Sequence, residues 1–238
     1  MSRPPLPPAA ALQLDTALQL LRQSGHLPPE GVPGSQAWLQ SLIDALVELS
    51  SRDALTGLAN RRSFDVALAR EIDRVARSGE PALLLALDID HFKRVNDTWG
   101  HAAGDLVIKA VAGVLNETVR PMDLVARVGG EEFAIILPNC PAHFGEAVAE
   151  RIRRKVESTV ISVAPVRDIQ VTVSVGGAFA PQWVRSTPAL WSERADLQLY
   201  RAKTSGRNLV CLEPAATSTV STEEKNLLFA LSPSQDHE

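Results

Sequence analysis

The stretch RVGGEEFAIILP, residues 127–138, constrains the fold of this chain more than any other feature. Two adjacent glycines, Gly129 and Gly130, separate two runs of residues with high strand propensity, which predicts a tight hairpin. We expect the glycines to supply the positive φ angles of a primed turn, since they adopt such angles at no steric cost. A hairpin in mid-chain joins antiparallel strands, so a purely parallel, doubly wound sheet is excluded.

The segments around this hairpin alternate between helical and strand periodicity. The chain has 238 residues, 45% of them hydrophobic, which is enough to bury the core of one domain with extensions. The patterns predict helices over 62–79, 103–119, 144–159 and 187–206, and strands over 81–90, 124–128, 132–138, 169–179 and 208–212. We therefore predict an α+β fold in which a central, mostly antiparallel sheet is surrounded by helices.

Three parts are expected along the chain: an N-terminal helical extension (1–52), the alternating domain (53–213) and a C-terminal tail (214–238) with a short helix near 223–231. The extension carries an apolar stripe at helical spacing, formed by Trp38, Leu39, Leu42, Ile43, Leu46 and Leu49. Such a stripe packs either on its own domain or on a second copy of the chain, and both interpretations stay open. We expect the segment to serve dimerisation or regulation.

Composition excludes several classes of protein. The formal net charge of −4 gives no electrostatic case for binding nucleic acid. Two cysteines, Cys140 and Cys211, are too few for a disulfide framework. The beginning lacks the apolar stretch of a secretory signal, and no apolar run is long enough to span a bilayer. A cytoplasmic protein is the expectation.

Acidic residues follow two of the predicted strand boundaries. Glu131 and Glu132 lie directly after the glycines, and two acids at a strand mouth repel each other unless a cation lies between them. Asp88 and Asp90 end the strand predicted over 81–90 and, being two apart, point to the same face. Such a pair could cap the next helix. Carboxylates that converge from two strand ends can instead share Mg²⁺ and support in-line phosphoryl transfer.

Six blocks of the sequence together resemble the GGDEF-domain diguanylate cyclases. They occur in the family's order and cover about 160 residues: DALTGLANRR (53–62), DIDHFKRVND (88–97), GHAAGD (100–105), RVGGEEF (127–133), VSVGGA (173–178) and ADLQLYRAKTSGRN (195–208). The resemblance implies condensation of two GTP into cyclic di-GMP with release of two pyrophosphates. It also implies a fold similar to the polymerase palm and class III nucleotidyl cyclases, and a homodimer in which each subunit presents one GTP.

The resemblance also assigns roles to residues at the acid clusters. Asp88, Glu131 and the backbone carbonyl of Ile89 are implied as ligands of Mg²⁺, with Mn²⁺ as a substitute. Glu131 and Glu132 are implied as the catalytic acids, and which of them takes the proton from the ribose 3′-hydroxyl stays open. Gly129 and Gly130 are implied to leave room for a phosphate.

Further positions match the family's substrate contacts. Asn96 and Asp105 are implied to read guanine, and an amide and a carboxylate suit its donors and acceptors. From the residues alone, Asp105 could equally be the N-cap of the following helix. The other implied substrate contacts are Leu55 at the base and Phe92, Lys93, Lys203 and Arg207 near the phosphates.

The segment RPMD, Arg120 to Asp123, matches the family's inhibitory RxxD motif, with Arg151 as a secondary arginine. The resemblance implies that cyclic di-GMP binds there and inhibits the enzyme. Without the resemblance, RxxD would be interpreted as a surface ion pair. Two other functions stay open: a receptor that binds cyclic di-GMP without turnover, and a cyclase with altered base choice.

Overall fold

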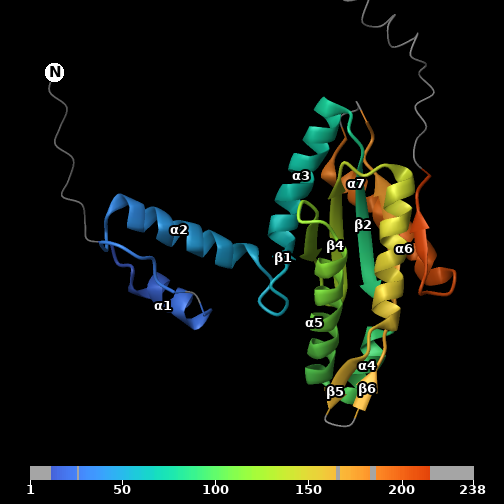
Figure 1. Cartoon of the computed structure of the whole chain (residues 1–238), viewed down its shortest axis with the longest axis horizontal. Helices are drawn as coiled ribbons and strands as arrows, with labels where there is room; N and C mark the ends of the chain where they lie inside the picture. Colours follow the sequence, from blue (N-terminus) through green and yellow to red (C-terminus); the bar gives the residue numbers. More distant parts are fainter. Residues whose placement is uncertain (1–11, 26, 165–166, 183–185, 215–238) are drawn as a thin grey trace, which may run out of the picture.

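The computed structural model describes residues 12–25, 27–164, 167–182 and 186–214. Its main body is a six-stranded sheet in the order β1-β3-β4-β2-β7-β8, with helices on both faces (Figure 1). The strands are β1 (Ala59–Asn60), β2 (Ala82–Ile89), β3 (Leu124–Arg127), β4 (Glu132–Pro138), β7 (Val173–Phe179) and β8 (Val210–Leu212). The predicted tail helix near 223–231 lies outside the described residues.

The sheet is mixed, with an antiparallel centre. β3, β4, β2 and β7 pair antiparallel in succession, while β1 on β3 and β8 on β7 are parallel pairs at the two edges. The palm-like α+β prediction with a mostly antiparallel sheet is therefore confirmed, and the two short parallel edges are an addition to it.

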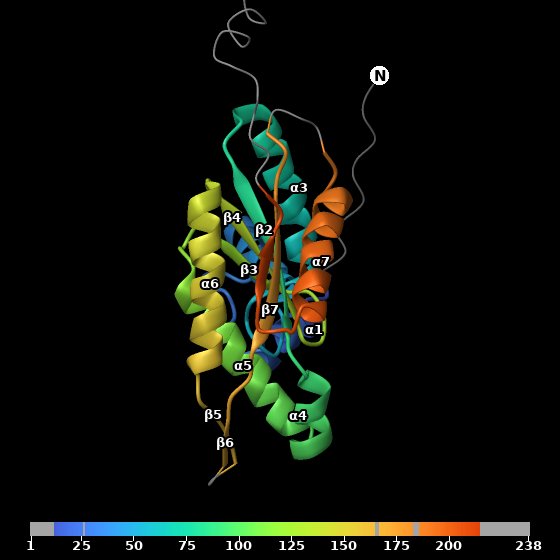
Figure 2. The ribbon, with the colours of Figure 1, turned by 90° about the vertical axis from the view of Figure 1, so that its right-hand side faces the viewer.

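Alternate residues of β2 face two different helical layers. Leu83, Leu85 and Leu87 belong to a core cluster that includes residues of α5 (His101–Thr118) and α6 (Ala142–Ser158). Ala82 and Leu84 belong to a second cluster, with residues of α3 (Arg61–Ser78) and α7 (Pro188–Thr204). Figure 2 shows the sheet edge-on between these layers. Because side chains alternate along a strand, Asp88 points to the α3/α7 side.

Besides β1, three short elements were not predicted as separate elements. α4 (Phe92–Trp99) follows β2, and a hairpin of β5 (Ile161–Ala164) and β6 (Arg167–Ile169) precedes β7. Helix α4 is only eight residues long, too short for a clear helical period. The prediction of one strand over 169–179 was partly wrong, because β7 begins at Val173 and Ile169 belongs to β6.

The N-terminal region contains α1 (Asp15–Gln23) and α2 (Gln36–Ser51), which lie beside the main body (Figure 1). Leu21, Trp38 and Leu42 form a small core between these two helices. Ile43 and Val47 on α2 are more than half exposed. One part of the apolar stripe thus packs within the extension, and another part is uncovered. No described helix has the length and apolar character needed to span a membrane.

Candidate active site

The two acid clusters meet at one end of the sheet. Asp88, the seventh residue of β2, is directly opposite Glu132, the first residue of β4. The backbone N–H of Ile89 donates to the carbonyl of Glu131 at 3.2 Å. Directly opposed residues on antiparallel strands share a face, so Glu132 joins Asp88 on the α3/α7 side. The sequence prediction that the clusters converge is confirmed.

Burial gives these acids unusual electrostatics. The Asp88 side chain is 9% exposed, and its carboxylate accepts an ion pair from the Lys203 ammonium on α7 at 2.7 Å. Burial raises the pKa of Asp88, a shift that Lys203 opposes and the charge of Glu132 reinforces. Burial and the charge of Asp88 raise the pKa of Glu131. The acids therefore hold excess negative charge at close quarters, and Lys203 compensates only part of it.

These residues fit a hard divalent cation. Among the described residues, no three His, Cys, Asp or Glu side chains gather into a metal-binding group. Mg²⁺ does not need such a cage, because it takes one or two carboxylates and fills its other positions with waters and substrate phosphates. Asp88 and Glu131 carry carboxylates of this kind, and a cation beside them would offset the charge of the neighbouring acids, which adds to burial in raising both pKa values.

The hairpin between β3 and β4 differs from the predicted primed turn. Neither Gly129 nor Gly130 has a positive φ, so that expectation was wrong. The backbone N–H groups of Val128 and Gly129 both donate to the carbonyl of Glu132, which makes a wider loop than a two-residue turn. At Gly129 a Cβ would lie 2.2 Å from Oε2 of Glu132. The Glu132 carboxylate thus folds over the Gly129 backbone, and any larger residue at position 129 would require this side chain to move.

Three residues that the sequence interpretation missed hold this loop. The Arg127 guanidinium donates to the carbonyl of Gly130 at 2.8 and 3.1 Å and pairs with Asp53 at 3.2 Å. Arg61 donates to the carbonyl of Val128 at 2.9 Å. Asp53 also accepts hydrogen bonds from Thr56, and its pKa is lowered by these bonds and by Arg127 against the effect of burial. In the sequence, these three residues are distinguished only by being charged and by lying inside the blocks that match the family.

The residues expected to read guanine lie at the junction of α4 and α5. Gly100, with φ of 80°, links the two helices. Asn96 ends up against Gly104, where a Cβ would lie 2.0 Å from the Asn96 Oδ1 atom. Asp105 is exposed within α5, whose N-cap is Gly100, so the capping interpretation of Asp105 was wrong.

The other expected substrate contacts differ in burial. Leu55 is partly buried against the main core. Phe92 is buried at the start of α4, and Lys93 beside it is exposed. Helix α4 begins after His91 with no side-chain cap, so neither Asp88 nor Asp90 caps it.

The expected phosphate contacts lie at the end of α7. Lys203 is in its last turn, and Arg207 follows in a left-handed conformation with φ of 63°. Arg207 is exposed and its backbone N–H donates to the carbonyl of Ala202. Lys203 thus forms an ion pair with Asp88, while the side chain of Arg207, four residues later, is exposed.

The RPMD turn forms a compact ion pair. The Arg120 guanidinium donates to both carboxylate oxygens of Asp123, at 3.0 and 3.3 Å, and the Asp123 side chain is only 2% exposed. Arg120 also covers the ring of Phe144 at 4.9 Å and donates to the carbonyl of Pro138. The Arg151 side chain on α6 donates to the backbone carbonyl of Thr118, and Thr118 lies just before this turn in the sequence. The ion pair is more buried than an ordinary surface pair.

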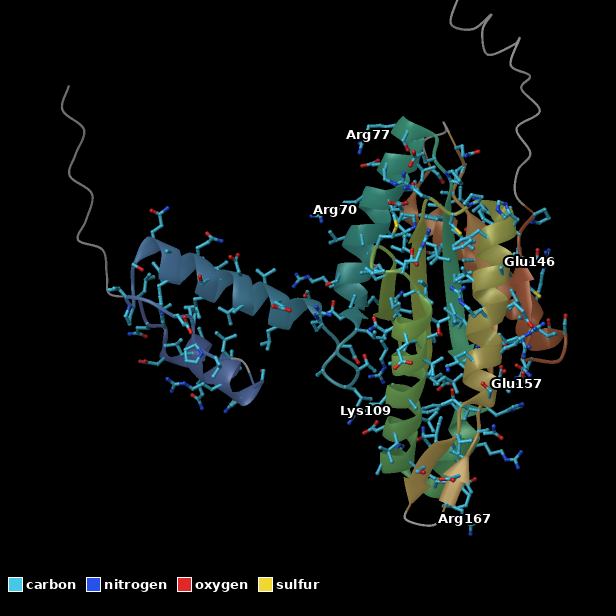
Figure 3. All side chains as sticks on the ribbon, viewed as in Figure 1. Arg70, Arg77, Lys109, Glu146, Glu157 and Arg167 are labelled. Atoms are coloured by element: carbon cyan, nitrogen blue, oxygen red, sulfur yellow. The ribbon has the colours of Figure 1, made fainter. Side chains whose placement is uncertain are left out.

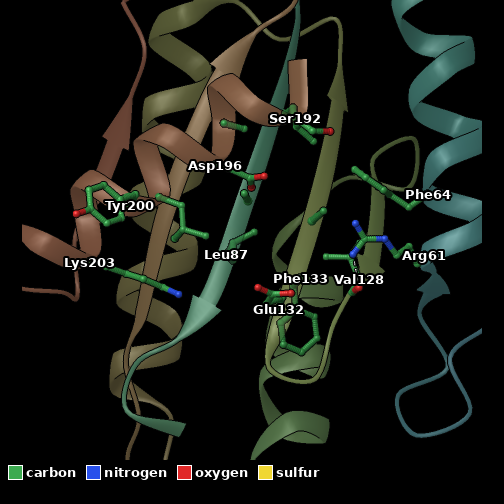
Figure 4. A pocket seen from close by; sticks show the side chains of 15 residues that line it. Arg61, Phe64, Leu87, Val128, Glu132, Phe133, Ser192, Asp196, Tyr200 and Lys203 are labelled. Atoms are coloured by element: carbon green, nitrogen blue, oxygen red, sulfur yellow. Dashed lines mark hydrogen bonds between the residues drawn. The ribbon is translucent and has the colours of Figure 1, made fainter. Parts of the chain in front are cut away.

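A cavity of about 350 Å³ opens beside Glu132, between α3, α7 and the sheet. Figure 4 shows Glu132, Asp196, Arg61 and Lys203 around it. Burial and the charge of Glu132 raise the pKa of Asp196, while Arg61 and Lys203 oppose this shift. Sequence reasoning did not single out Asp196, although it belongs to the last matched block.

Comparisons with known proteins agree with this geometry. The family model described as "Diguanylate cyclase, GGDEF domain" matches residues 50–209. Over 211 residues the chain is 37% identical to the response regulator PleD of Caulobacter vibrioides, covering 88% of this chain and 44% of PleD. It is 39% identical to the probable diguanylate cyclase DgcC of Escherichia coli, covering 67% of this chain and 42% of DgcC. The chain thus spans less than half the length of these relatives.

Solved structures give the same result. The coiled coil and GGDEF domain of DgcB from Caulobacter crescentus, in complex with c-di-GMP, matches with a TM-score of 0.69 and 36% identity, covering 74% of this chain and 92% of that one. The diguanylate cyclase SiaD of Pseudomonas aeruginosa, in complex with its activator SiaC, matches with a TM-score of 0.69 and 36% identity, covering 84% and 73%. The chain therefore belongs to the GGDEF-domain family of diguanylate cyclases.

Proposed function

We propose that this protein is a diguanylate cyclase that condenses two GTP into cyclic di-GMP and two pyrophosphates. One observation carries the proposal: Asp88, Glu131 and Glu132 meet at the end of the sheet beside the cationic end of α7. Degenerate members of a cyclase family would be expected to lose an acid at such a site. Here all three acids and both hairpin glycines are present.

In this proposal Asp88, Glu131 and the Ile89 carbonyl hold Mg²⁺, for which Mn²⁺ can substitute. The bound ion supplies charge stabilisation at the phosphates and lowers the pKa of the attacking hydroxyl. Asn96 and Asp105 bind guanine, with Leu55 at the base. The phosphates of the bound nucleotide lie beside Phe92, Lys93, Gly129 and Gly130.

Lys203 and Arg207 bind the terminal phosphates. Because Lys203 pairs with Asp88 in the described structure, it must exchange that carboxylate for a phosphate when the nucleotide and cation enter. Glu132 lies at the cavity and directly opposite Asp88, which supports it as the group that takes the 3′-hydroxyl proton.

The reaction requires two copies of the chain. Each site holds one GTP and the product is two-fold symmetric, so two subunits must face each other across a C₂ axis. Ile43 of the α2 stripe and Val47 beside it in the same helix are more than half exposed, which supports the extension as a dimerisation segment. Product inhibition is proposed at Arg120, Asp123 and Arg151, where an arginine fork and a carboxylate can bind a guanine edge once their mutual ion pair opens.

The test of the proposed site compares turnover of GTP with Mg²⁺ by the wild type and by Glu132→Gln. The amide keeps the size of the side chain but cannot accept the proton, so cyclic dinucleotide formation should disappear while the thermal transition is retained. ATP added in excess should not compete, because Asp105 accepts hydrogen bonds from guanine donors that adenine lacks. Binding of cyclic di-GMP without any turnover would identify a receptor instead, and equal use of ATP would reject the guanine assignment.

A further inference from the structure

Asp90 is a buried carboxylate for which the proposed reaction has no use. It is 5% exposed and accepts three hydrogen bonds: from Thr172 Oγ1 at 2.7 Å, from Ser174 Oγ at 2.6 Å and from the backbone N–H of Asn208 at 2.9 Å. No ion-pair partner of Asp90 is found within the described ranges. A buried carboxylate is costly unless it is fully hydrogen-bonded, so these three donors must be held in place for it.

One of the three donors belongs to the turn after α7. Arg207 and Asn208 both have left-handed backbones, with φ of 63° and 47°. Two consecutive non-glycine residues in this region are strained and persist only where the surroundings fix them. The bond from the Asn208 N–H to Asp90 is one such restraint.

The side chain of Asn208 supplies two more restraints, both on α6. Its Oδ1 accepts from Arg153 at 2.6 Å, and its Nδ2 donates to Oε1 of Glu157 at 2.7 Å. Figure 3 labels Glu157 on the C-terminal half of α6. Arg153 in turn pairs with Glu150 and Glu157, so the anchor is a network and not a single bond.

The location of this anchor suggests its purpose. Asn208 directly follows Arg207, and the turn begins at the end of the helix that carries Lys203. At its other end the anchor is attached to Asp90, two residues after Asp88 on the same strand end. The network therefore fixes the backbone of the turn that follows Lys203 and carries Arg207, relative to the strand end of the acid that is proposed to hold the metal.

We propose that Asp90 and Asn208 are positioning residues that hold the turn after α7 so that Lys203 and Arg207 bind the distal phosphates of the nucleotide. The inference rests on the proposed function, because only a polyphosphate substrate would meet both the cationic turn and Asp88. Neither residue touches the nucleotide in this account. Their effect passes through Lys203 and Arg207.

The decisive variant is Asn208→Gly. Glycine adopts the left-handed backbone freely and retains the N–H that donates to Asp90, so the chain can still fold. Only the attachment to Arg153 and Glu157 is lost. The matched control is Asn139→Gly, which makes the same substitution at another asparagine with a left-handed backbone, an exposed one with φ of 49°, at the opposite end of β4. Asp90→Asn is a second, more disruptive variant, because an amide cannot accept all three bonds.

The measurement is calorimetric binding of a non-hydrolysable GTP analogue and of GMP, each with Mg²⁺, to the full chain. A residue that positions distal phosphates should affect only the first ligand. Asn208→Gly should lower the affinity for the GTP analogue about tenfold, which is the loss expected for one charge-assisted contact. The affinity for GMP should stay within about twofold of the wild-type value. Asp90→Asn should show the same selective loss, and Asn139→Gly should retain wild-type values for both ligands.

Three results would overturn the inference, and they are distinguishable. If the wild type prefers the GTP analogue over GMP and Asn208→Gly keeps that preference, the positioning role is wrong while the proposed function stands. If the wild type itself shows no preference for the triphosphate, the proposed function fails together with the inference. Equal weakening of both ligands by Asn208→Gly would indicate a merely structural role.

Discussion

Gly176 in β7 lies where α7 crosses the sheet, and its replacement by alanine tests how closely the helix packs. A Cβ there would lie 2.0 Å from the backbone nitrogen of Leu199 and 2.5 Å from the carbonyl oxygen of Ala195. Real Cβ contacts essentially never fall below 3.0 Å. Because the obstacles are backbone atoms, α7 must move away by about 1 Å. Such overpacking costs about 1–3 kcal/mol, which lowers the melting temperature of a domain of this size by roughly 2–12 °C.

The displacement should also reach the active site, since α7 carries Lys203. Gly176→Ala is expected to lower both the melting temperature and the affinity for a GTP analogue with Mg²⁺. Gly177→Ala is the control, because its Cβ would meet the ends of the Leu212 and Leu85 side chains and not α7. It should lower the melting temperature while GTP affinity persists. A Gly176→Ala protein with wild-type stability would refute the packing argument, and equal loss of affinity in both variants would refute the link to Lys203.

Further predictions concern stability, inhibition and pH. Gly113 is exposed within α5 with open space around its Cα, so Gly113→Ala should raise the unfolding free energy by about 0.5–1 kcal/mol in urea denaturation; a loss of stability would contradict this. Arg120→Ala should relieve inhibition by added cyclic di-GMP in a turnover assay without changing the initial rate, and unchanged inhibition would reject the proposed product site. Removing the ion pair by Lys203→Gln should tighten Mn²⁺ binding to the nucleotide-free protein and weaken GTP binding; calorimetry showing unchanged Mn²⁺ affinity would contradict the exchange of partners. The pKa values of Asp88 and Glu131 are raised above the ordinary values of 3.8 and 4.5. In the metal-free protein, the contribution of these two acids to the free energy of unfolding is therefore fully present below the ordinary values. It is lost as the pH rises through the raised pKa values. Metal binding has the opposite sign: it requires the ionised carboxylates, so Mn²⁺ affinity should fall on acidification already above pH 4.5, and affinity that is constant down to that pH would contradict the shift.

Sequence periodicity predicted most of the sheet because long buried strands carry a clear signal. β2 reads ALLLALDI, is buried nearly throughout and ends at Ile89, one residue before the predicted end at Asp90. The same reasoning failed at Gly129, because a Gly-Gly pair between strands is typical of a primed turn. There the side chain of Glu132, a residue three positions later, occupies the space beside the Gly129 backbone.

The remaining parts of the site depend on contacts between residues far apart in the sequence. Asp53 and Arg127 are separated by 74 residues, and Asp90 and Asn208 by 118. No local pattern predicts that such residues meet. Both pairs lie inside the blocks that match the family, so the blocks indicated that these residues are important without indicating what they contact.

The identity of the product decides whether this protein is a working diguanylate cyclase. Purified full chain, freed of bound nucleotide, is incubated with GTP and Mg²⁺, and the products are separated by chromatography. The account predicts one cyclic di-GMP for every two pyrophosphates from the wild type and from Arg120→Ala, and none from Glu132→Gln. If neither the wild type nor Arg120→Ala forms cyclic di-GMP, the acids at the end of the sheet do not make a working cyclase.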